Sequence, residues 1–375
     1  MMRIAVNTRF LLSDYLEGYG HFLQEIFSRL VKAHPEHEFI FIFDRPFDQK
    51  FIFGKNVTPV VTGPPARHPL LWKYWYDFKL PAVLKKHKAD VFFSPDGFCS
   101  LRTAVPQCLV IHDLAFLHFP SGISGSQLRF YKRNTPDYIA KAKTLITVSE
   151  FSKKDILENY PAASGKIRVI HNGIRPLFHP RSYEEKEAVK QQYTGGKEFF
   201  LCTGSLHPRK NGMNLLKAFS LFKKRQQSSM KLVLAGRLAW KYESFTESLK
   251  SYKYRDDVIL TGYLPEEELA ALTAAAYAQV YPSFFEGFGL PVAEAMQSGV
   301  AVITSAQSAM QEIAGEAALY ADPADIQAIA DQLKRIYKDE TLRSELIRKG
   351  LDRSEKFDWD TAAALCWKAI EETIG

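Results

Sequence analysis

Short apolar runs alternate with stretches of helical pattern along the whole chain, and this alternation limits the possible folds more than any other feature. Continuous apolar runs of strand length, separated by helices, are typical of parallel strands that are covered on both faces. The pattern therefore predicts an α/β protein. The runs lie at 3–8, 38–44, 90–95, 107–113 and 144–149, and then at 167–173, 198–205, 231–237, 257–263, 278–283 and 301–306.

This number of strands and the length of the chain both favour two domains. Roughly a dozen strands is too many for one comfortable open sheet, and 375 residues is long for a single core. A break is expected near residues 171–192, where the Asn172-Gly173 turn is followed by Pro176, Pro180 and a polar helix. We therefore expect two Rossmann-like domains.

Composition excludes several classes of protein. Hydrophobic residues make up 46% of the chain and charged residues 24%, as in a soluble globular protein. No apolar run reaches the ~20 residues of a membrane span, and "MMRIAVNTRF" is read as a first strand rather than a signal peptide. The net charge of +7 suits anionic partners. Because the basic residues are scattered, we expect phosphate-bearing small molecules and no nucleic acid.

The cysteines indicate a reducing compartment. Cys99, Cys108, Cys202 and Cys366 show no CxxC spacing, and three of them lie in apolar runs. Buried free thiols in a cytoplasmic protein are expected, and a zinc site is not.

One short segment combines strand, loop and helix signals. "EGFGLPVAEA" begins at Glu286, follows the apolar run 278–283 and precedes another at 301–306. Pro291 suits the first helical position, and Gly299 suits the residue just beyond the helix. The loop then lies at the carboxyl end of a parallel strand, where open α/β sheets bind ligands. Gly287 and Gly289 allow close approach of backbone, and amides at a helix N-terminus favour an anion such as a diphosphate.

The two glutamates of this segment need a separate reason. Glu286 is expected in the loop and Glu294 on the first turn of the helix. A carboxylate beside a phosphate site can accept hydrogen bonds from hydroxyls, in which a nucleotide sugar is rich. Glu294 alone could equally be a favourable first-turn acid.

Nine stretches in a fixed order resemble the retaining GT-B glycosyltransferases of family 4. The segment "PSFFEGFGLPVAEAMQSGVAVITS" resembles their donor-binding segment, with its two glutamates separated by seven residues. The C-terminal half is the more specific part of a match that spans nearly the whole chain. The other stretches are "EGYGHFLQEIFSRL", "VIHDLAF", "ITVSEFSKKDI" with "VIHNGI", "TGSLHPRKNGMNLLKAF", "LVLAGR" and "LTGYLPEEEL" with "AALYADPAD".

The resemblance implies a fold of two facing Rossmann-like domains with the active site in the cleft between them. The final helix of such enzymes returns to the N-terminal domain. We therefore expect an acceptor-binding domain of residues 1–173 together with 358–375, and a donor-binding domain of residues 174–357.

The resemblance also implies a donor site. Glu286 would bind the transferred sugar near its C3 hydroxyl, and Glu294 would bind the ribose hydroxyls. The backbone of Phe288, Gly289 and Leu290 would meet the diphosphate.

The loop that matches "TGSLHPRK" would supply positive charge. Gly204 opens this loop, and Arg209 and Lys210 would neutralise the departing diphosphate. Adjacent cations in a loop are otherwise commonly solvated. Many relatives have an arginine directly after the glycine, and Ser205 stands there in this chain. Arg209 is expected to take its place.

In the N-terminal half, the resemblance assigns His112 to the active site, in contact with the transferred sugar near C6. Gly18 and Gly20 would let the first loop approach the phosphates or the acceptor. Without the resemblance, a single histidine near a strand end is more commonly structural.

The implied reaction is transfer of a hexosyl group with retention of configuration. Retaining glycosidases use one of two close carboxyls as a nucleophile, whereas this family is described by front-face attack. We expect GDP-mannose or a UDP-sugar as donor, with mannose favoured. The acceptor would be a growing polysaccharide, such as lipopolysaccharide, or a lipid-linked oligosaccharide.

No metal is expected. Asp358-Trp359-Asp360 has the form of a metal-binding DxD triplet, but it precedes a helix, for which Asp358 or Asp360 is a suitable N-cap. His34 and His37 are expected in a solvated loop.

The segment 67–90 mixes aromatic and basic residues. We expect most of its aromatic side chains in the N-terminal core, with its lysines available to an anionic membrane. The protein would then be cytoplasmic and peripheral at the inner face of a membrane. The aromatic residues are Trp72, Tyr74, Trp75 and Tyr76, and the lysines are Lys73, Lys79, Lys85, Lys86 and Lys88.

Three alternatives remain open. The chain could be a GT-B phosphorylase or epimerase, although these lack this order of basic loop and paired glutamates. It could be a non-catalytic scaffold that binds a sugar nucleotide. A dehydrogenase is less consistent, because "EGYGHFL" lacks the third glycine of the dinucleotide fingerprint.

Overall fold

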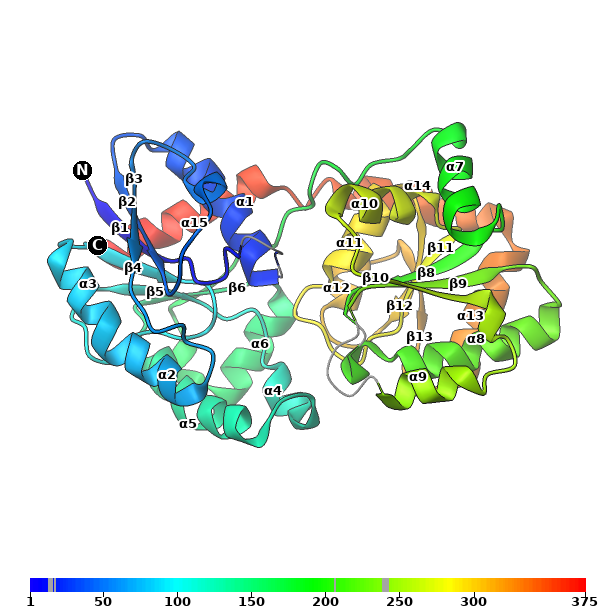
Figure 1. Ribbon diagram of the computed structural model, residues 1–375, viewed down its shortest axis with the longest axis horizontal. Helices are drawn as coiled ribbons and strands as arrows, with labels where there is room; N and C mark the ends of the chain where they lie inside the picture. Colours follow the sequence, from blue (N-terminus) through cyan, green and yellow to red (C-terminus); the bar gives the residue numbers. More distant parts are fainter. Residues whose placement is uncertain (13–15, 17, 206, 238–242) are drawn as a thin grey trace. The chain divides into compact units, whose positions relative to one another are not determined.

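The computed structural model describes residues 1–12, 16, 18–205, 207–237 and 243–375, with the side chains of 243, 244 and 246 left aside. The chain forms two compact units (Figure 1). The N-terminal unit comprises Met1–Gly173 and Asp358–Gly375, and the C-terminal unit comprises Ile174–Phe357.

The N-terminal unit contains a parallel sheet of seven strands in the order β3-β2-β1-β4-β5-β6-β7. Consecutive residues of each central strand face opposite sides. Ile4 and Val6 of β1 enter one hydrophobic cluster, and Ala5 enters another. The strands are β1 (Arg3–Asn7), β2 (Glu38–Phe43), β3 (Val57–Val61), β4 (Val91–Ser94), β5 (Gln107–Val110), β6 (Thr144–Thr147) and β7 (Ile167–Val169).

Helices cover both faces of this sheet. The principal ones are α1 (Gly18–Ala33), α2 (Pro69–Tyr74), α3 (Leu80–Lys86), α4 (Ala115–His118), α5 (Gly125–Lys141), α6 (Glu150–Asn159) and α15 (Trp359–Ile374). A π-helical turn, η2 (Trp75–Lys79), joins α2 to α3.

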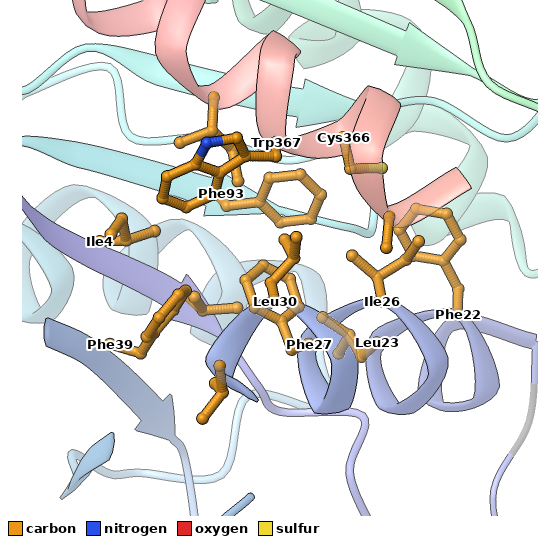
Figure 2. Close-up of a cluster of buried hydrophobic side chains, with 14 of the residues drawn as sticks. Ile4, Phe22, Leu23, Ile26, Phe27, Leu30, Phe39, Phe93, Cys366 and Trp367 are labelled. Carbon is orange, nitrogen blue, oxygen red and sulfur yellow. The ribbon is translucent and has the colours of Figure 1, made fainter. Parts of the chain in front are cut away.

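The last helix, α15, packs beside α1 on one face of the N-terminal sheet (Figure 2). Cys366 and Trp367 of α15 meet Phe27 and Phe93 in one buried cluster. The segment 358–375 therefore completes the core of the N-terminal unit.

The C-terminal unit repeats this plan with six parallel strands in the order β10-β9-β8-β11-β12-β13. The strands are β8 (Phe199–Thr203), β9 (Lys231–Ala235), β10 (Val258–Gly262), β11 (Ala278–Tyr281), β12 (Ala301–Ser305) and β13 (Ala318–Ala321). The helices are α7 (Tyr183–Thr194), α8 (Gly212–Gln226), α9 (Glu243–Lys250), α10 (Glu266–Ala275), α11 (Leu290–Gln297), α12 (Met310–Ala314), α13 (Ile326–Lys338) and α14 (Glu340–Ser354).

Each sheet reverses its strand order once, between β1 and β4 in the first unit and between β8 and β11 in the second. At such a reversal the two connecting loops leave in opposite directions and open a crevice at the carboxyl ends of the strands. The loops after β8 and β11 therefore form the expected ligand-binding edge of the C-terminal unit. The predicted α/β class with two Rossmann-like domains is confirmed.

Some local predictions need correction. Leu290 is the first residue of α11, so Pro291 takes the second helical position. Glu294 consequently lies on the second turn rather than the first, and it cannot serve as a first-turn acid. Gly299 follows the helix with φ +69°, as expected for a residue that ends a helix in the left-handed conformation.

The histidines after α1 were predicted to lie in a solvated loop, and this prediction is wrong. The His34 ring stacks on Trp367 of α15 with 3.5 Å between ring centroids, and His37 lies 5.2 Å from the same indole. Asp358 is the N-cap of α15, and Asp360 instead forms an ion pair with Arg29 of α1. Both aspartates thus hold α15 in place.

The four cysteines are free and buried, as expected. In the part of the chain that the structure describes, no helix is both long enough and apolar enough to cross a membrane.

Gly173 provides a test of how α15 is seated. A Cβ atom at this position would lie 2.4 Å from the Trp359 backbone nitrogen and 2.5 Å from its side chain. Gly173→Ala should therefore overpack this contact and lower the free energy of unfolding by about 1–3 kcal/mol, as measured by urea denaturation. Gly125→Ala is the control, because a Cβ there meets no atom within 4 Å. Equal stability of the two variants would contradict this packing.

Candidate active site

The loops after β8 and β11 are tied together at the strand-order reversal of the C-terminal unit. The Phe284 backbone N–H donates to the Arg209 carbonyl at 2.9 Å, and the Ser283 hydroxyl oxygen lies 3.1 Å from the same carbonyl oxygen. Asn211 donates through its side-chain amide to the Pro282 carbonyl at 3.0 Å. The basic loop and the glutamate loop are thus positioned as one structure.

Glu286 lies at the centre of this arrangement and is only 7% exposed. Its Oε1 atom accepts hydrogen bonds from Lys210 Nζ at 2.6 Å, Ser283 Oγ at 2.6 Å and Tyr281 Oη at 3.1 Å. Its Oε2 atom lies 3.2 Å from the Arg209 guanidinium. The structure therefore brings together three residues predicted from the sequence: Glu286, Lys210 and Arg209.

The charges of this cluster determine whether the Glu286 side chain is ionised. Burial alone would raise the pKa of Glu286, but the positive charges of Arg209 and Lys210 and the hydrogen bonds to its oxygens lower that pKa to about 2. Burial lowers the pKa of Lys210, and Glu286 opposes that effect. With both cations charged and Glu286 ionised, the cluster has a net charge of +1, which favours an anionic ligand.

The second glutamate has a different set of partners. Glu294 is 7% exposed, and its Oε1 atom lies 2.8 Å from the Arg175 guanidinium. Arg175 also contacts Glu266, at 3.0 Å. Burial raises the pKa of Glu294, and the charge of Arg175 opposes this rise. Arg175 thus links the start of the C-terminal unit to α10 and α11.

Two glycines of the predicted donor site have backbone conformations that side chains rarely adopt. Gly204 has φ +108° and lies against Gly236, where a Cβ atom would be 2.1 Å from the Gly204 carbonyl oxygen. Gly289 has φ +97°, and a Cβ there would meet the end of Met310. Phe288 packs beside Phe357, and Leu290 begins α11.

His112 follows β5 in the N-terminal unit. Its ring lies between Tyr19 and Phe22 of α1, at centroid distances of 4.9 and 5.2 Å. Its Nε2 atom is 3.0 Å from the Pro95 carbonyl oxygen. A carbonyl can only accept a hydrogen bond, so Nε2 bears the proton. Burial lowers the pKa of His112 to about 4, so the neutral ring retains Nδ1 as an acceptor.

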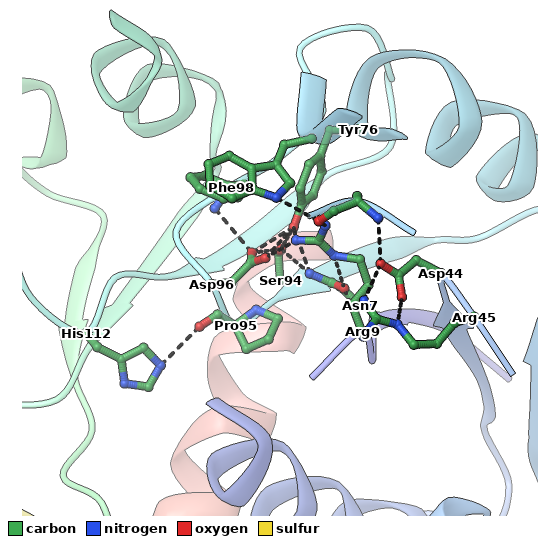
Figure 3. Close-up of polar contacts among 12 residues, drawn as sticks. Asn7, Arg9, Asp44, Arg45, Tyr76, Ser94, Pro95, Asp96, Phe98 and His112 are labelled. Carbon is green, nitrogen blue, oxygen red and sulfur yellow. Dashed lines mark hydrogen bonds and ion pairs between the residues drawn. The ribbon is translucent and has the colours of Figure 1, made fainter. Parts of the chain in front are cut away.

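The carbonyl that holds His112 belongs to a loop fixed by a buried polar network (Figure 3). Arg9 forms an ion pair of 2.5 Å with Asp96, which directly follows Pro95. Tyr76 and Ser94 donate to Asp96 at 2.7 and 3.0 Å. The loops after β1 and β4 are therefore joined at the strand-order reversal, as their counterparts are in the C-terminal unit.

The glycines of the first loop differ in their surroundings. A Cβ atom at Gly20 would lie 2.6 Å from the Phe10 carbonyl oxygen, so close packing of α1 accounts for this residue. Among the described residues, a Cβ at Gly18 would meet no atom within 4 Å, and Gly18 is the first residue of α1. Glu17 and Leu206, which belong to two of the quoted stretches, lie outside the described residues.

Sequence reasoning missed the groups that hold the predicted residues. Tyr281 and Ser283 bind Glu286, Arg175 binds Glu294, and Asp96 fixes the loop that holds His112. Tyr281 ends β11, and Ser283 follows it in the loop that carries Glu286, so their closeness in sequence was an available signal. Arg175 is 119 residues from Glu294, and no local pattern marks that pair.

One group of described side chains has metal-ligand composition: His34, Glu36 and His37 in the N-terminal unit. The Met2 backbone N–H donates to His37 Nδ1 at 3.1 Å. His37 Nε2 then bears the ring proton and faces Glu36 at 3.2 Å. These contacts are those of a neutral histidine whose N–H faces a carboxylate, and they serve the packing of the N-terminal unit.

The state of His112 can be measured directly. ¹⁵N-resolved NMR of the histidine rings should show His112 as the neutral Nε2–H tautomer, titrating near pH 4 instead of the unperturbed value of about 6.5. The folded state binds a proton less readily than the unfolded state, so this residue's contribution to stability is complete above about pH 6.5 and is lost as pH falls toward 4. His112→Gln identifies the signal. An Nδ1–H tautomer or titration near pH 6.5 would contradict the geometry.

Comparison with known proteins places this site in a family. Residues 184–353 match the family "Glycosyl transferases group 1", and residues 17–176 match "Glycosyltransferase Family 4". O-antigen chain mannosyltransferase B of Escherichia coli is 30% identical over 302 residues, which is 78% of each chain. O-antigen chain mannosyltransferase RfbU of Salmonella typhimurium is 29% identical over 275 residues, covering 72% of this chain and 71% of RfbU.

Solved structures show the same fold at low sequence identity. Sucrose-phosphate synthase of Thermosynechococcus elongatus superposes with a TM-score of 0.79 at 18% identity over 98% of each chain. HepE of Anabaena, solved with UDP-glucose, gives a TM-score of 0.76 at 17% identity over 99% of this chain and all of HepE. The chain therefore has the GT-B fold and belongs to the family 4 glycosyltransferases.

Proposed function

We propose that this glycosyltransferase moves a mannosyl group from a nucleotide-diphosphate sugar to a saccharide or lipid-linked saccharide acceptor, with retention at the anomeric carbon and without a metal ion. GDP-mannose is favoured over a UDP-sugar. The names of the two mannosyltransferase relatives, both concerned with the O-antigen chain, support mannose and a role in surface polysaccharide synthesis.

The observation that carries this proposal is the Glu286 cluster at the carboxyl ends of β8 and β11. Lys210 and Arg209 supply two positive charges at the same place as one carboxylate. A diphosphate leaving group gains negative charge as its bond to the sugar breaks, and positioned cations stabilise that charge. These two side chains can perform the neutralisation for which other enzymes use a divalent metal.

Glu286 is suited to bind a sugar hydroxyl rather than to attack the anomeric carbon. Its low pKa keeps it ionised and makes it a weak base. Its oxygens are already engaged by Lys210, Arg209, Ser283 and Tyr281, which fix their direction. A fixed carboxylate orients the donor sugar, and orientation of reactants lowers the barrier without a covalent intermediate.

Glu294 is suited to bind the ribose. Its carboxylate is held by Arg175 through Oε1, and it lies on α11, whose N-terminus follows the glutamate loop. A carboxylate held in one orientation can accept hydrogen bonds from two neighbouring hydroxyls. The diphosphate would meet the backbone of Phe288, Gly289 and Leu290, where positive partial charge at a helix N-terminus favours an anion.

The proposed chemical step is front-face displacement. The acceptor hydroxyl oxygen forms a bond to the anomeric carbon on the face from which the diphosphate leaves. The bond between that carbon and the diphosphate oxygen breaks, and this oxygen takes the proton of the acceptor hydroxyl. The chain's own residues supply position and charge: Lys210 and Arg209 for the leaving group, Glu286 for the sugar.

His112 would act on the sugar through its unprotonated Nδ1. A neutral ring with Nε2–H committed to the Pro95 carbonyl offers one hydrogen-bond acceptor, which can receive a hydrogen bond from the C6 hydroxyl.

The N-terminal unit that carries His112 and Gly18 would bind the acceptor saccharide. We place the enzyme in the cytoplasm, in peripheral contact with the inner face of a membrane.

A panel of donors tests the proposal. We expect one GDP-sugar to raise the melting temperature in the presence of EDTA, with stabilisation of about 2.7 kcal/mol at a hundredfold excess over Kd. GDP-, UDP-, ADP- and dTDP-sugars would be compared by differential scanning fluorimetry. Glu294→Ala should lose most of the effect. Glu316→Ala is the control, since its side chain is 92% exposed in the same unit.

Several outcomes would contradict parts of the proposal. Equal stabilisation of both variants would remove Glu294 from the donor site, and loss of donor binding in EDTA would show that a metal is needed. A product with inverted anomeric configuration, observed by NMR, would overturn retention. Donor binding without transfer to any polysaccharide or lipid-linked acceptor would favour a non-catalytic scaffold.

A further inference from the structure

We infer that one face of the N-terminal unit, formed by residues 67–88, docks on an anionic lipid surface. This docking face consists of α2, η2 and α3 with the residues that precede and follow them. The inference gives a location to the peripheral contact named in the proposed function. It is independent of which sugar is transferred.

Three large apolar side chains on this segment are left outside the core. Leu70 is 75% exposed, Tyr74 42% and Phe78 49%. They recur every four residues, so they follow one side of the helical segment. Of the nine exposed large hydrophobic residues in the described part of the chain, these three lie within one stretch of nine residues. Such clustering marks a surface that meets another apolar phase.

The fold itself does not use these three side chains. The opposite side of the same segment buries Trp72, Trp75 and Tyr76, which are at most 9% exposed. Trp72 packs against Phe130 of α5 with ring centroids 5.3 Å apart. The aromatic residues predicted for the core are therefore buried, apart from Tyr74. The segment is apolar on two sides, and packing explains only the inner one.

Every exposed charge on this segment is positive. Asp77 is the one acidic residue from 67 to 88, and its side chain is 4% exposed. It accepts a hydrogen bond from the Leu101 backbone N–H at 3.0 Å and forms an ion pair with Lys73 at 3.1 Å. The exposed cationic residues are Arg67, Lys73, Lys85, Lys86 and Lys88, and Lys79 is partly exposed.

The cations lie directly beside the exposed rings. The Tyr74 and Phe78 rings stack at 5.7 Å. The Lys79 ammonium is 5.7 Å from the Tyr74 ring centroid, and the Arg102 guanidinium is 4.1 Å from that of Phe78. Aromatic rings flanked by lysine and arginine are suited to the boundary between lipid headgroups and acyl chains. The rings would enter that boundary while the cations remain at the phosphates.

The neighbouring helix extends the positive charge. Figure 1 shows α2 and α5 close together in the N-terminal unit, and the Trp72–Phe130 contact confirms that they pack. Helix α5 carries exposed Arg129, Lys132 and Arg133.

Charge complementarity favours an anionic membrane over a second copy of the chain. Two such faces brought together would place the exposed cations of residues 67–88 opposite one another, with no exposed acid in that segment to pair with them. Exposed Asp90 and Asp137 lie outside it, and the cations of the segment outnumber them. Phosphatidylglycerol and similar lipids supply negative charge at about 1 kcal/mol per nearby lysine or arginine. The three apolar side chains add a smaller favourable free energy of binding. Because most of the attraction is between charges, we expect reversible binding that salt weakens.

Vesicle sedimentation tests the inference with the full chain. Wild-type protein should sediment with vesicles of phosphatidylcholine mixed with phosphatidylglycerol, much less with phosphatidylcholine alone, and less as salt rises. Lys85→Glu/Lys86→Glu should lower the partition coefficient by about 25-fold or more, at about fivefold per cation removed. Leu70→Ser/Tyr74→Ser/Phe78→Ser should also lower it, by at least about tenfold.

Matched controls separate this face from general effects of charge and apolar area. Lys217→Glu/Lys224→Glu makes the same change of charge at exposed positions of α8 in the C-terminal unit. Tyr183→Ser/Tyr263→Ser removes exposed rings, 73% and 50% accessible, from that unit. Both controls should bind vesicles as the wild type does. Donor-induced stabilisation of each variant shows that its C-terminal unit is folded, so failure of docking is distinguishable from failure of the proposed donor site.

Three outcomes would overturn the inference. Wild-type protein could fail to bind anionic vesicles, or the controls could lose as much binding as the docking-face variants. Light scattering could also show a wild-type dimer that Leu70→Ser/Tyr74→Ser/Phe78→Ser converts to a monomer, which would make a second copy the occupant of this face.

Discussion

Glu286 is a buried carboxylate, and a buried charge is stable only when it is paired and hydrogen-bonded. This requirement explains the surrounding architecture. Lys210 and Arg209 come from the loop after β8, and Ser283 and Tyr281 come from the end of β11 and its loop. Because β8 and β11 are neighbours at the reversal of strand order, two loops far apart in sequence meet there. The ion cluster thus links the sheet topology to the site proposed for the donor.

The N-terminal unit meets a similar requirement with different residues. The Arg9–Asp96 pair is buried, and it joins the loops after β1 and β4 at the corresponding reversal. Its consequence for chemistry is indirect: it fixes the loop whose Pro95 carbonyl sets the tautomer of His112. Both units therefore use a buried ion pair at the same topological position. In the C-terminal unit the ion pair holds Glu286, which is predicted to bind the donor. In the N-terminal unit the ion pair holds the loop that supports His112.

Much of this architecture could be predicted from local sequence. Apolar runs predicted eleven of the thirteen described strands, all except β3 and β13, and Asn172-Gly173 lies at the break between the units. Glu286, Lys210 and Arg209 could be named because the resemblance fixes their order, and the structure places them in contact. Arg175 could not, since its pairing with Glu294 depends on tertiary structure. The predicted turn of Glu294 is wrong because α11 begins at Leu290, one residue before the predicted first helical residue, Pro291. His34 and His37 looked solvated because nothing local indicates that Trp367 covers them.

The most direct test of the central claim compares two ligands on one variant. Glu286→Gln removes the negative charge but leaves Lys210 and Arg209 in place. If the cluster binds the diphosphate through its cations and the sugar through Glu286, isothermal titration should show GDP affinity unchanged or increased and GDP-mannose affinity decreased. Circular dichroism would confirm that the variant is folded. Parallel loss of affinity for both ligands, or no change in either, would contradict the account.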